Sequence, residues 1–224
     1  METQSIADIG IKQNPFSPGL MQYQNKATKA LYRRVVGALA WPRDIRPGAL
    51  VVLVEHQEPM SGLDMRKVEI AAEYTHDDPD QLLRRASLWS EVLSCRAWMT
   101  PVSAPEMRLV TDYNDGRRRL RLPQLDLALP PSVNGSRDWA AYDRLFERRT
   151  RGVKTLFFGE GSMVAREYKS RQRAELSRSL ELYPLLAAFL WALASIDLDS
   201  PVTAMGQGIT RQTSNGPADD IGGY

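Results

Sequence analysis

The pattern of apolar and polar positions predicts two neighbouring strands. Residues 49–54 form a continuous apolar run rich in β-branched side chains, which is typical of a strand covered on both faces. In residues 68–74, apolar and polar side chains alternate, which predicts a strand with one polar face. Because a short connection rich in turn residues joins them, we expect the strands to be antiparallel, with the first at the centre of a sheet.

A helix is expected ahead of these strands. Leu31, Val35 and Leu39 recur every four residues, with basic side chains between them. This spacing predicts an amphipathic helix over residues 26–40, which Pro42 would stop. Its basic face would be exposed to solvent.

A stronger helix signal follows the second strand. Asp78 can accept hydrogen bonds from the first N–H groups of a helix, and Pro79 suits the first helical position. We therefore expect a helix over residues 79–95, and we interpret His76-Asp77-Asp78 as its cap rather than as a metal-binding corner. A further strand is expected within residues 97–102.

A hairpin is predicted next along the chain. Residues 108–113 and 118–122 are interpreted as its strands, because Asn114-Asp115-Gly116 between them tolerates the positive φ angles of a tight turn. A basic β-ribbon of this kind can enter a groove of duplex DNA. The alternative is a hairpin that is solvated or that pairs with an acidic partner protein. The candidate nucleic-acid-binding residues on this hairpin are Arg117, Arg118, Arg119 and Arg121.

The last third of the chain predicts a helix, a strand and a long helical stretch. Ser136 can cap the first helix, residues 153–158 form the strand, and the helical stretch from Ser162 has a kink or restart at Pro184. The apolar run from Leu182 to Ile196 is shorter than the roughly 20 residues that span a bilayer. We interpret it as a buried core helix and expect no membrane association.

Together these segments predict an α/β protein with a mixed central sheet flanked by helices. We expect an extended arm over residues 1–25, a single domain over residues 26–200, and a disordered tail over residues 201–224, where small polar residues predominate. The amino terminus has no recognisable secretory signal, so we expect the protein in the cytoplasm of a host cell or in a virion.

Composition removes several kinds of site. The chain of 224 residues has one cysteine and two histidines, which excludes an internal disulfide and a zinc site with four nitrogen and sulfur ligands. Its 29 Lys and Arg residues against 27 Asp and Glu residues give a formal net charge of +2. The whole molecule therefore attracts nucleic acid only weakly, and any basic surface must be local. Cys95 is expected to be a small buried hydrophobic residue.

The order of elements resembles the ribonuclease H-like fold and, within it, the nuclease domain of phage terminase large subunits, over roughly residues 49–198. Two local patterns carry the resemblance: the apolar strand that ends in Glu55, and the apolar closing helix that begins at Tyr183-Pro184. The family cuts concatemeric DNA during head filling by two-metal phosphodiester hydrolysis, in which converging carboxylates hold Mg²⁺ or Mn²⁺. The resemblance implies these ions as cofactors if the chain is catalytically active, and otherwise none.

The resemblance also implies catalytic residues. They are Glu55, which would be the pivotal metal ligand, and Asp112. Asp64 and Glu69 are further carboxylates that would have to converge on Glu55 from elsewhere, although nothing in their spacing requires it.

The chain departs from the family at two other places. Where the family's next strand ends in an acid, this chain has Thr100-Pro101, and near the start of the closing helix it has Tyr183, Pro184 and Ala187 in place of acids. One acid cannot hold two ions, so a decayed nuclease site is favoured over an intact one.

Two smaller motifs have simpler interpretations. Glu55-His56-Gln57-Glu58 suggests a metal or acid–base site, but strand alternation separates Glu55 and Gln57 from His56 and Glu58, which favours a polar strand end. Gly159-Glu160-Gly161-Ser162 lacks the lysine of a phosphate-binding loop and is interpreted as a tight turn.

From the sequence we expect an accessory protein of a phage or other mobile element. Its ribonuclease H-like core would act on or near DNA, in genome packaging or processing, and would be a decayed rather than an active nuclease. The alternative is a non-enzymatic structural or assembly protein of a phage particle. In that alternative its arm and tail would reach neighbouring proteins of the particle. DNA and protein partners in a larger assembly are therefore the expected partners, with no membrane.

Overall fold

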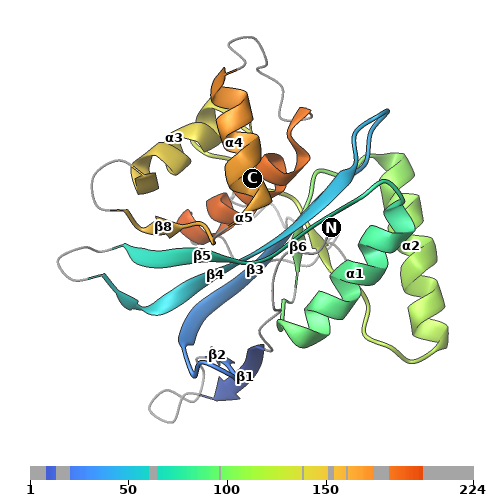
Figure 1. Ribbon diagram of the computed structural model, residues 1–224. Coiled ribbons are helices and arrows are strands. Elements are labelled where there is room, and N and C mark those ends of the chain that lie inside the picture. Colours follow the sequence, from blue (N-terminus) through green and yellow to red (C-terminus); the bar gives the residue numbers. More distant parts are fainter. Residues whose placement is uncertain are drawn as a thin grey trace, which may run out of the picture.

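An open, mixed sheet of eight strands, flanked by five helices, makes up the described part of the chain (Figure 1). The computed structural model describes residues 9–13, 21–60, 65–95, 97–137, 139–150, 154–159, 161–173 and 182–198. The strands are β1 (Ile9–Gln13), β2 (Met21–Asn25), β3 (Leu31–Ala40), β4 (Gly48–Pro59), β5 (Arg66–His76), β6 (Trp98–Met99), β7 (Leu127–Ala128) and β8 (Leu156–Phe157). The helices are α1 (Pro79–Val92), α2 (Ala104–Arg119), α3 (Trp139–Thr150), α4 (Met163–Arg173) and α5 (Pro184–Asp197). The expected α/β class is confirmed.

The strand order places β3 and β4 in the middle of the sheet. The long strands β3, β4 and β5 follow one another and pair antiparallel, and β8 adds to β5 in parallel. On the other side of β3, its second half pairs in parallel with β6, and β6 pairs in parallel with β7. The first residues of β3 pair with β2, which pairs with β1. The strands β3, β6 and β7 therefore point the same way.

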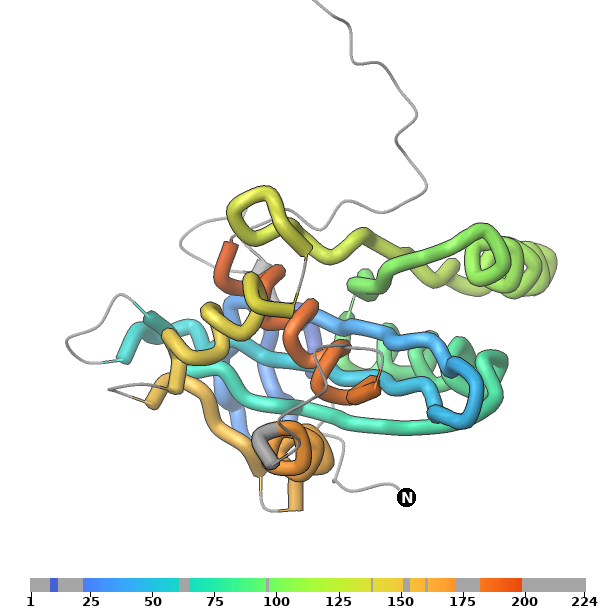
Figure 2. The backbone as a smooth tube through the Cα atoms, turned by 90° about the horizontal axis from the view of Figure 1, so that it is seen from above, coloured from blue at the N-terminus to red at the C-terminus, as the bar shows by residue number. Residues whose placement is uncertain are grey.

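Side chains of the central strands alternate between two cores, one on each face of the sheet. Ala38 and Val51 belong to the core formed with α3, α4 and α5, whereas Leu39 and Val52 belong to the core formed with α1 and α2. Figure 2 shows the three long strands side by side, and Figure 1 shows the two groups of helices on either side of them. Residues 49–53 have no exposed area, which confirms the predicted central strand.

Strand β3 replaces the helix predicted over residues 26–40. A spacing of four residues places Leu31, Val35 and Leu39 on one face of a helix, but it also places them on one face of a strand, because four is a multiple of the strand period of two. Val36 belongs to the opposite core, so the segment is buried on both faces. The helix prediction was therefore wrong because the same spacing fits both structures.

Helix α2 replaces the hairpin predicted around Asn114-Asp115-Gly116. Ser103 and Glu106 form a capping box at its start, in which Ser103 N donates to a Glu106 carboxylate oxygen at 2.8 Å. Asn114 does not form a turn, because its side-chain amide donates to Leu125 O at 3.0 Å and its side-chain oxygen accepts from Leu125 N at 2.8 Å. The predicted basic β-ribbon is thus wrong, and its arginines lie at the end of a helix.

Most of the other predicted elements are confirmed, but α3 begins at Trp139, and Ser136, expected as its cap, pairs instead with Val133 in a short turn. Asp78 caps α1, since its Oδ1 accepts from Asp80 N at 2.9 Å. Strands β6 and β8 lie inside the predicted segments, β4 and β5 pair antiparallel, and Pro184 begins a new helix. Helix α5 is buried along nearly all of its length, as expected of a core helix. Among the described residues, no helix is long and apolar enough to cross a membrane.

Two strands lie in the stretch expected as an amino-terminal arm. The stretch expected as an extended arm contains β1 and β2, which are paired into the sheet. Asn25 shapes the turn into β3, because its Oδ1 accepts from Ala27 N at 2.9 Å and from Thr28 N at 3.0 Å. The tail expected over residues 201–224 lies outside the described residues.

Candidate functional site

The carboxyl ends of the parallel strands β3, β6 and β7 lie together at one end of the sheet. Ligands of open α/β sheets bind in the crevice outside such ends. A pocket of about 270 Å³ lies there, between the strand ends and the first turns of α5, and we call it the carboxyl-end pocket. It is lined by Ala40, Trp41, Arg43, Pro101, Leu129, Pro130, Arg137, Tyr142, Pro184, Ala187 and Trp191.

Aromatic rings and arginines give this pocket its chemical character. Trp41, Tyr142 and Trp191 bring rings from three separate segments, and the exposed side chains of Arg43 and Arg137 bring positive charge. Aromatic faces stack on planar groups, and guanidinium groups pair with phosphates or carboxylates. The pocket therefore suits a ligand that combines a ring with an anionic group.

The Tyr142 hydroxyl has a hydrogen-bond partner in the described part of the chain, whereas the indole N–H of Trp41 has none there. The Tyr142 hydroxyl donates to Pro131 O at 3.0 Å, which fixes the position of its ring. Trp41 is buried, and its indole Nε1 has no hydrogen-bond partner among the described residues. A buried donor without a partner costs free energy, so this N–H is available to an acceptor on a ligand that reaches it.

No described residue that lines the carboxyl-end pocket carries a carboxylate. Two hard cations would need several carboxylates, and no group of three or more His, Cys, Asp or Glu side chains in the described ranges is placed to hold a metal ion. The pocket is lined by Pro101, Pro184 and Ala187, which stand at or beside positions where the resemblance implies acids. These residues do not fit a pair of Mg²⁺ or Mn²⁺ ions.

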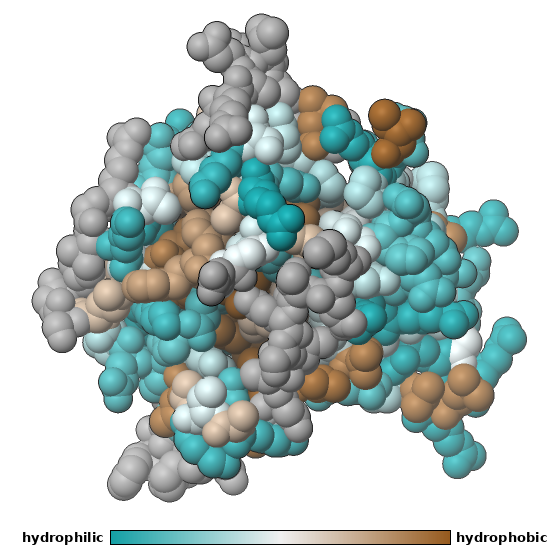
Figure 3. All heavy atoms as spheres, viewed as in Figure 1, coloured by the Kyte–Doolittle hydropathy of each residue, from teal (hydrophilic) through white to brown (hydrophobic). Residues whose placement is uncertain are grey.

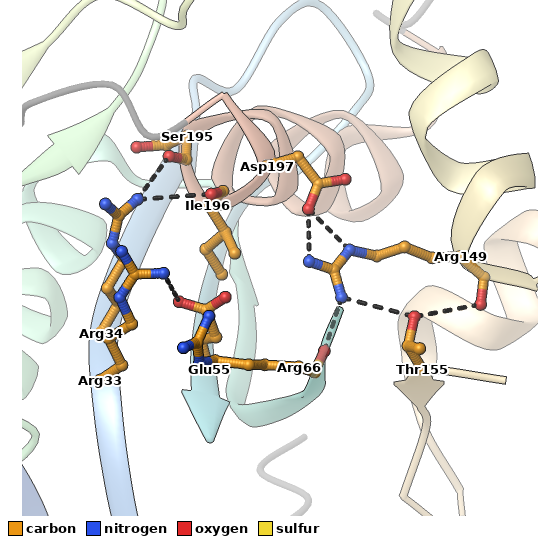
Figure 4. A network of polar contacts seen from close by, with 9 residues as sticks. All are labelled: Arg33, Arg34, Glu55, Arg66, Arg149, Thr155, Ser195, Ile196 and Asp197. Carbon is orange, nitrogen blue, oxygen red and sulfur yellow. Dashed lines mark hydrogen bonds and ion pairs between the residues drawn. The ribbon is translucent and has the colours of Figure 1, made fainter. Parts of the chain in front are cut away.

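Glu55 lies at the other end of the sheet. Because β4 is antiparallel to β3, the end of the apolar run pairs with the start of β3, where Glu55 is opposite Arg34. The Glu55 side chain is buried, with the residue 4% exposed, and Arg33 Nη1 lies 3.8 Å from its Oε2. Figure 4 shows it among arginine side chains. The structure thus brings cations, rather than further carboxylates, to the predicted metal ligand.

Burial and charge act on Glu55 in opposite directions. Burial raises the pKa of its carboxyl group, and the positive charges of four arginines oppose that rise. These arginines, in order of decreasing effect, are Arg33, Arg34, Arg149 and Arg66. We interpret Glu55 as a buried carboxyl group that is held beside this group of largely half-buried arginines.

The same network anchors the carboxyl end of α5 (Figure 4). Arg149 Nε donates to Asp197 Oδ1 at 2.7 Å, and the two side chains are only 4% and 3% exposed. Arg149 Nη1 also donates to Arg66 O at 2.8 Å, which ties α3 and α5 to β5. Arg34 Nη1 donates to two carbonyls in the last turn of α5, both at 3.3 Å. These hydrogen bonds hold the last turn of α5 against β3.

The predicted catalytic acid Asp112 does not join Glu55. Asp112 is exposed on α2, a helix of the core on the other face of the sheet. Its position does not support a convergence of carboxylates at Glu55. Asp64 lies outside the described residues.

His56 and Glu69 form a separate polar cluster. His56 contacts the ring of Tyr32, which belongs to the α1-facing core, whereas Glu55 lies on the α5 side. His56 Nε2 is 3.1 Å from Glu69 Oε1, and Lys67 Nζ is 2.7 Å from Glu69 Oε2. The hydrogen bond from His56 is the main cause that lowers the pKa of Glu69 to about 2. The arrangement matches a polar strand end in which one carboxylate oxygen of Glu69 faces His56 and the other faces Lys67.

The predicted DNA-binding arginines lie in the last turn of α2 and just after it. Arg117 Nη2 is 3.0 Å from Glu91 Oε1 of α1, and its side chain is 13% exposed, so it links two helices. Arg118 Nη1 is 3.2 Å from Asp115 Oδ1, Arg119 is exposed, and Arg121 has a φ of 56°. Arg117 lines a hollow beside β1, apart from the carboxyl-end pocket.

Two further carboxylates cap helices. Glu73 accepts hydrogen bonds from Ser162 Oγ at 2.5 Å and from Met163 N at 2.6 Å, at the start of α4. The protein's own carboxylate thus occupies the place where the preceding glycine-rich turn would hold a phosphate. Glu167 Oε2 accepts from Leu186 N at 2.9 Å, at the start of α5. Burial is the main cause that raises the pKa of Glu167 to about 7.

Reasoning from the sequence missed the carboxyl-end pocket. Arg43, Arg137, Tyr142 and Trp191 come from separate segments, and no spacing along the chain relates them. The one available signal was the pair of departures from the family, at Thr100-Pro101 and in the first turns of α5. Both lie at or beside this pocket.

No family model matches the sequence, and comparisons with curated proteins and with solved structures found no match either. Function must therefore be argued from the pocket and the strands that form it.

Proposed function

We propose that this chain is an accessory protein of a phage or other mobile element whose ribonuclease H-like core binds a nucleic-acid strand at the carboxyl-end pocket without cutting it. The composition of that pocket carries the proposal. Arginines and aromatic rings meet at the ends of three parallel strands, and no described lining residue supplies a carboxylate. A role in genome packaging or processing would follow from the binding of DNA.

Strand order and direction support the ribonuclease H-like part of the proposal. That fold has three consecutive antiparallel strands, then a helix, and then two strands parallel to the first and beside it, with a helix between them. This chain has the same order of elements, which runs β3, β4, β5, α1, β6, α2 and β7. The family's acid-bearing central strand then corresponds to β3, which ends in Ala40-Trp41 and not in an acid.

The chemistry of the pocket favours nucleic acid as the ligand. A nucleic-acid strand presents bases that stack on aromatic rings and phosphates that pair with arginine. Trp191, which is partly exposed, supplies a ring on which a base can stack, the buried rings of Trp41 and Tyr142 form the wall beside it, and Arg43 and Arg137 supply the charges. Because the basic surface is local, the small net charge of the whole molecule does not oppose such binding.

Replacing both Arg43 and Arg137 by glutamine is expected to weaken binding of a single-stranded DNA oligonucleotide by about 10–100-fold, because two phosphate contacts are lost. The slope of log affinity against log salt concentration should also become shallower by about 1.4. Fluorescence anisotropy of a labelled oligonucleotide, measured over a series of salt concentrations, gives both quantities.

The matched control removes two exposed arginines from the end of α2 by the changes Arg118→Gln and Arg119→Gln. It lowers the net charge equally, and we expect its affinity to stay within about threefold of the unmodified protein. If this control loses affinity while the Arg43 and Arg137 variant does not, the nucleic acid binds at α2. If the unmodified protein binds no oligonucleotide at low salt, the proposed function is wrong.

A plasmid-nicking assay tests the non-catalytic part of the proposal. We expect the protein, with added Mg²⁺ or Mn²⁺, to nick supercoiled plasmid no faster than a protein-free sample, because its pocket lacks the carboxylates that hold such ions. Metal-dependent nicking that Glu55→Ala abolishes would contradict this expectation and would make Glu55 a metal ligand.

A further inference from the structure

We propose that the turn between β3 and β4 is a wedge that opens the end of a DNA duplex, with Ile45 as the side chain that enters between the bases. The inference rests on the proposed function, because it requires DNA at the adjacent carboxyl-end pocket. Ile45 is 91% exposed, more than any other large apolar side chain among the described residues. Single exposed apolar residues are common, so the argument depends on what surrounds this one.

The surroundings of Ile45 match the end of a duplex. Arg43 and Arg46 flank it and are both exposed. Proteins that kink or open DNA insert apolar side chains, isoleucine among them, between base steps while cationic side chains hold the backbone. In Figure 3 the corner of the molecule that holds this turn shows hydrophobic atoms beside hydrophilic ones.

The hairpin is built as a stiff support. Arg43 N donates to Arg46 O at 3.1 Å, and Arg46 N donates to Arg43 O at 2.8 Å, across a turn in which Asp44 has a φ of 48°. At the base of the hairpin, Gly48 is packed so closely that an added Cβ would lie 2.8 Å from Ala40 O. A wedge needs this support, because a pliant loop would bend aside before two paired bases separate.

The wedge and the pocket are adjacent in the chain, at the end of β3. Ala40, Trp41 and Arg43 line the carboxyl-end pocket, and Ile45 lies two residues beyond. A base separated from its partner at Ile45 would therefore come next to the partly exposed ring of Trp191. The pocket would hold the unpaired strand while the turn keeps the complementary strand away.

A stem-loop oligonucleotide with a fluorophore and a contact quencher at its two ends tests the wedge, since it presents one blunt duplex end. Saturating unmodified protein is expected to raise the fluorescence toward that of the unquenched strand. Ile45→Ala should still bind but should lose this rise, and Ile45→Leu should keep it. The matched control Leu120→Ala, which removes an exposed apolar side chain just beyond α2, should also keep it.

The outcomes separate the wedge from the proposed function. If binding depends on Arg43 and Arg137 but fluorescence does not rise, the wedge is wrong and the proposed function stands. If Ile45→Ala opens the stem as well as the unmodified protein does, Ile45 is not the wedge. Failure to bind any oligonucleotide removes both proposals. Dimerisation without DNA that Ile45→Ala abolishes, measured by light scattering, would assign the turn to a contact between copies and overturn the wedge.

Discussion

Replacing Arg149 by methionine is expected to lower the free energy of unfolding by about 3–5 kcal/mol, because the buried carboxylate of Asp197 is left without its cation. The change also removes the hydrogen bonds to Arg66 O and Thr155 Oγ1, so α3 and α5 lose their shared connection to β5. Urea unfolding at pH 7, followed by circular dichroism, measures the difference.

Two further variants show whether the effect arises from the buried ion pair. Arg148 is the exposed neighbour of Arg149 on α3, and Arg148→Met is expected to change the free energy of unfolding by less than about 0.5 kcal/mol. Adding Asp197→Leu to Arg149→Met should restore part of the stability, because no unpaired charge then remains buried. A loss of under about 1 kcal/mol for Arg149→Met would mean that the pair does not anchor α5.

The second large effect concerns Glu167 and pH. Burial raises the pKa of Glu167 from its ordinary value near 4.5 to about 7 in the folded protein. The folded state thus binds the proton more tightly than the unfolded state does. Its stabilising contribution is complete below about pH 4.5 and is lost as the pH rises through about 7. At pH 8 the ionised carboxylate should cost up to about 3 kcal/mol relative to its acid form.

Glu167→Gln is therefore expected to be more stable than the unmodified protein at pH 8, by up to about 3 kcal/mol, and nearly equal to it at pH 4.5. Glutamine keeps an oxygen that can accept from Leu186 N at the start of α5. Urea unfolding at both pH values measures the difference. Glu58→Gln, at an exposed carboxylate of β4, is the control and should show no such dependence. Equal stability of Glu167→Gln and the unmodified protein at pH 8 would refute the assigned role of burial.

The fold was predictable where a pattern fits one structure only. The short, β-branched apolar run of β4 favours a strand, the capped start at Asp78 favours a helix, and both are confirmed. The four-residue spacing in β3 fits a helix and a strand equally well. Asn114-Asp115-Gly116 favours a turn, but the capping box ahead of α2 and the bonds from Asn114 to Leu125 fix a helix. In these two segments, packing and capping outweigh local preference.

The site was harder to predict because it depends on strand direction. Glu55 follows the most apolar strand, but β4 runs opposite to β3, β6 and β7, so its end lies away from the carboxyl-end pocket. Arg149 and Asp197 are 48 residues apart in the sequence, and only the fold brings them together. Positions at which the resemblance implied acids, such as Pro101 and Pro184, line the pocket, but with side chains that cannot hold a metal ion.

Ultraviolet crosslinking of the protein to a single-stranded oligonucleotide carrying bromodeoxyuridine, with the attached peptides identified by mass spectrometry, tests the central claim most directly. The account predicts crosslinks in peptides that contain Trp41, Tyr142 or Trp191, and their loss in the Arg43→Gln, Arg137→Gln variant. Crosslinks confined to the end of α2, or crosslinks that this variant leaves unchanged, would contradict it.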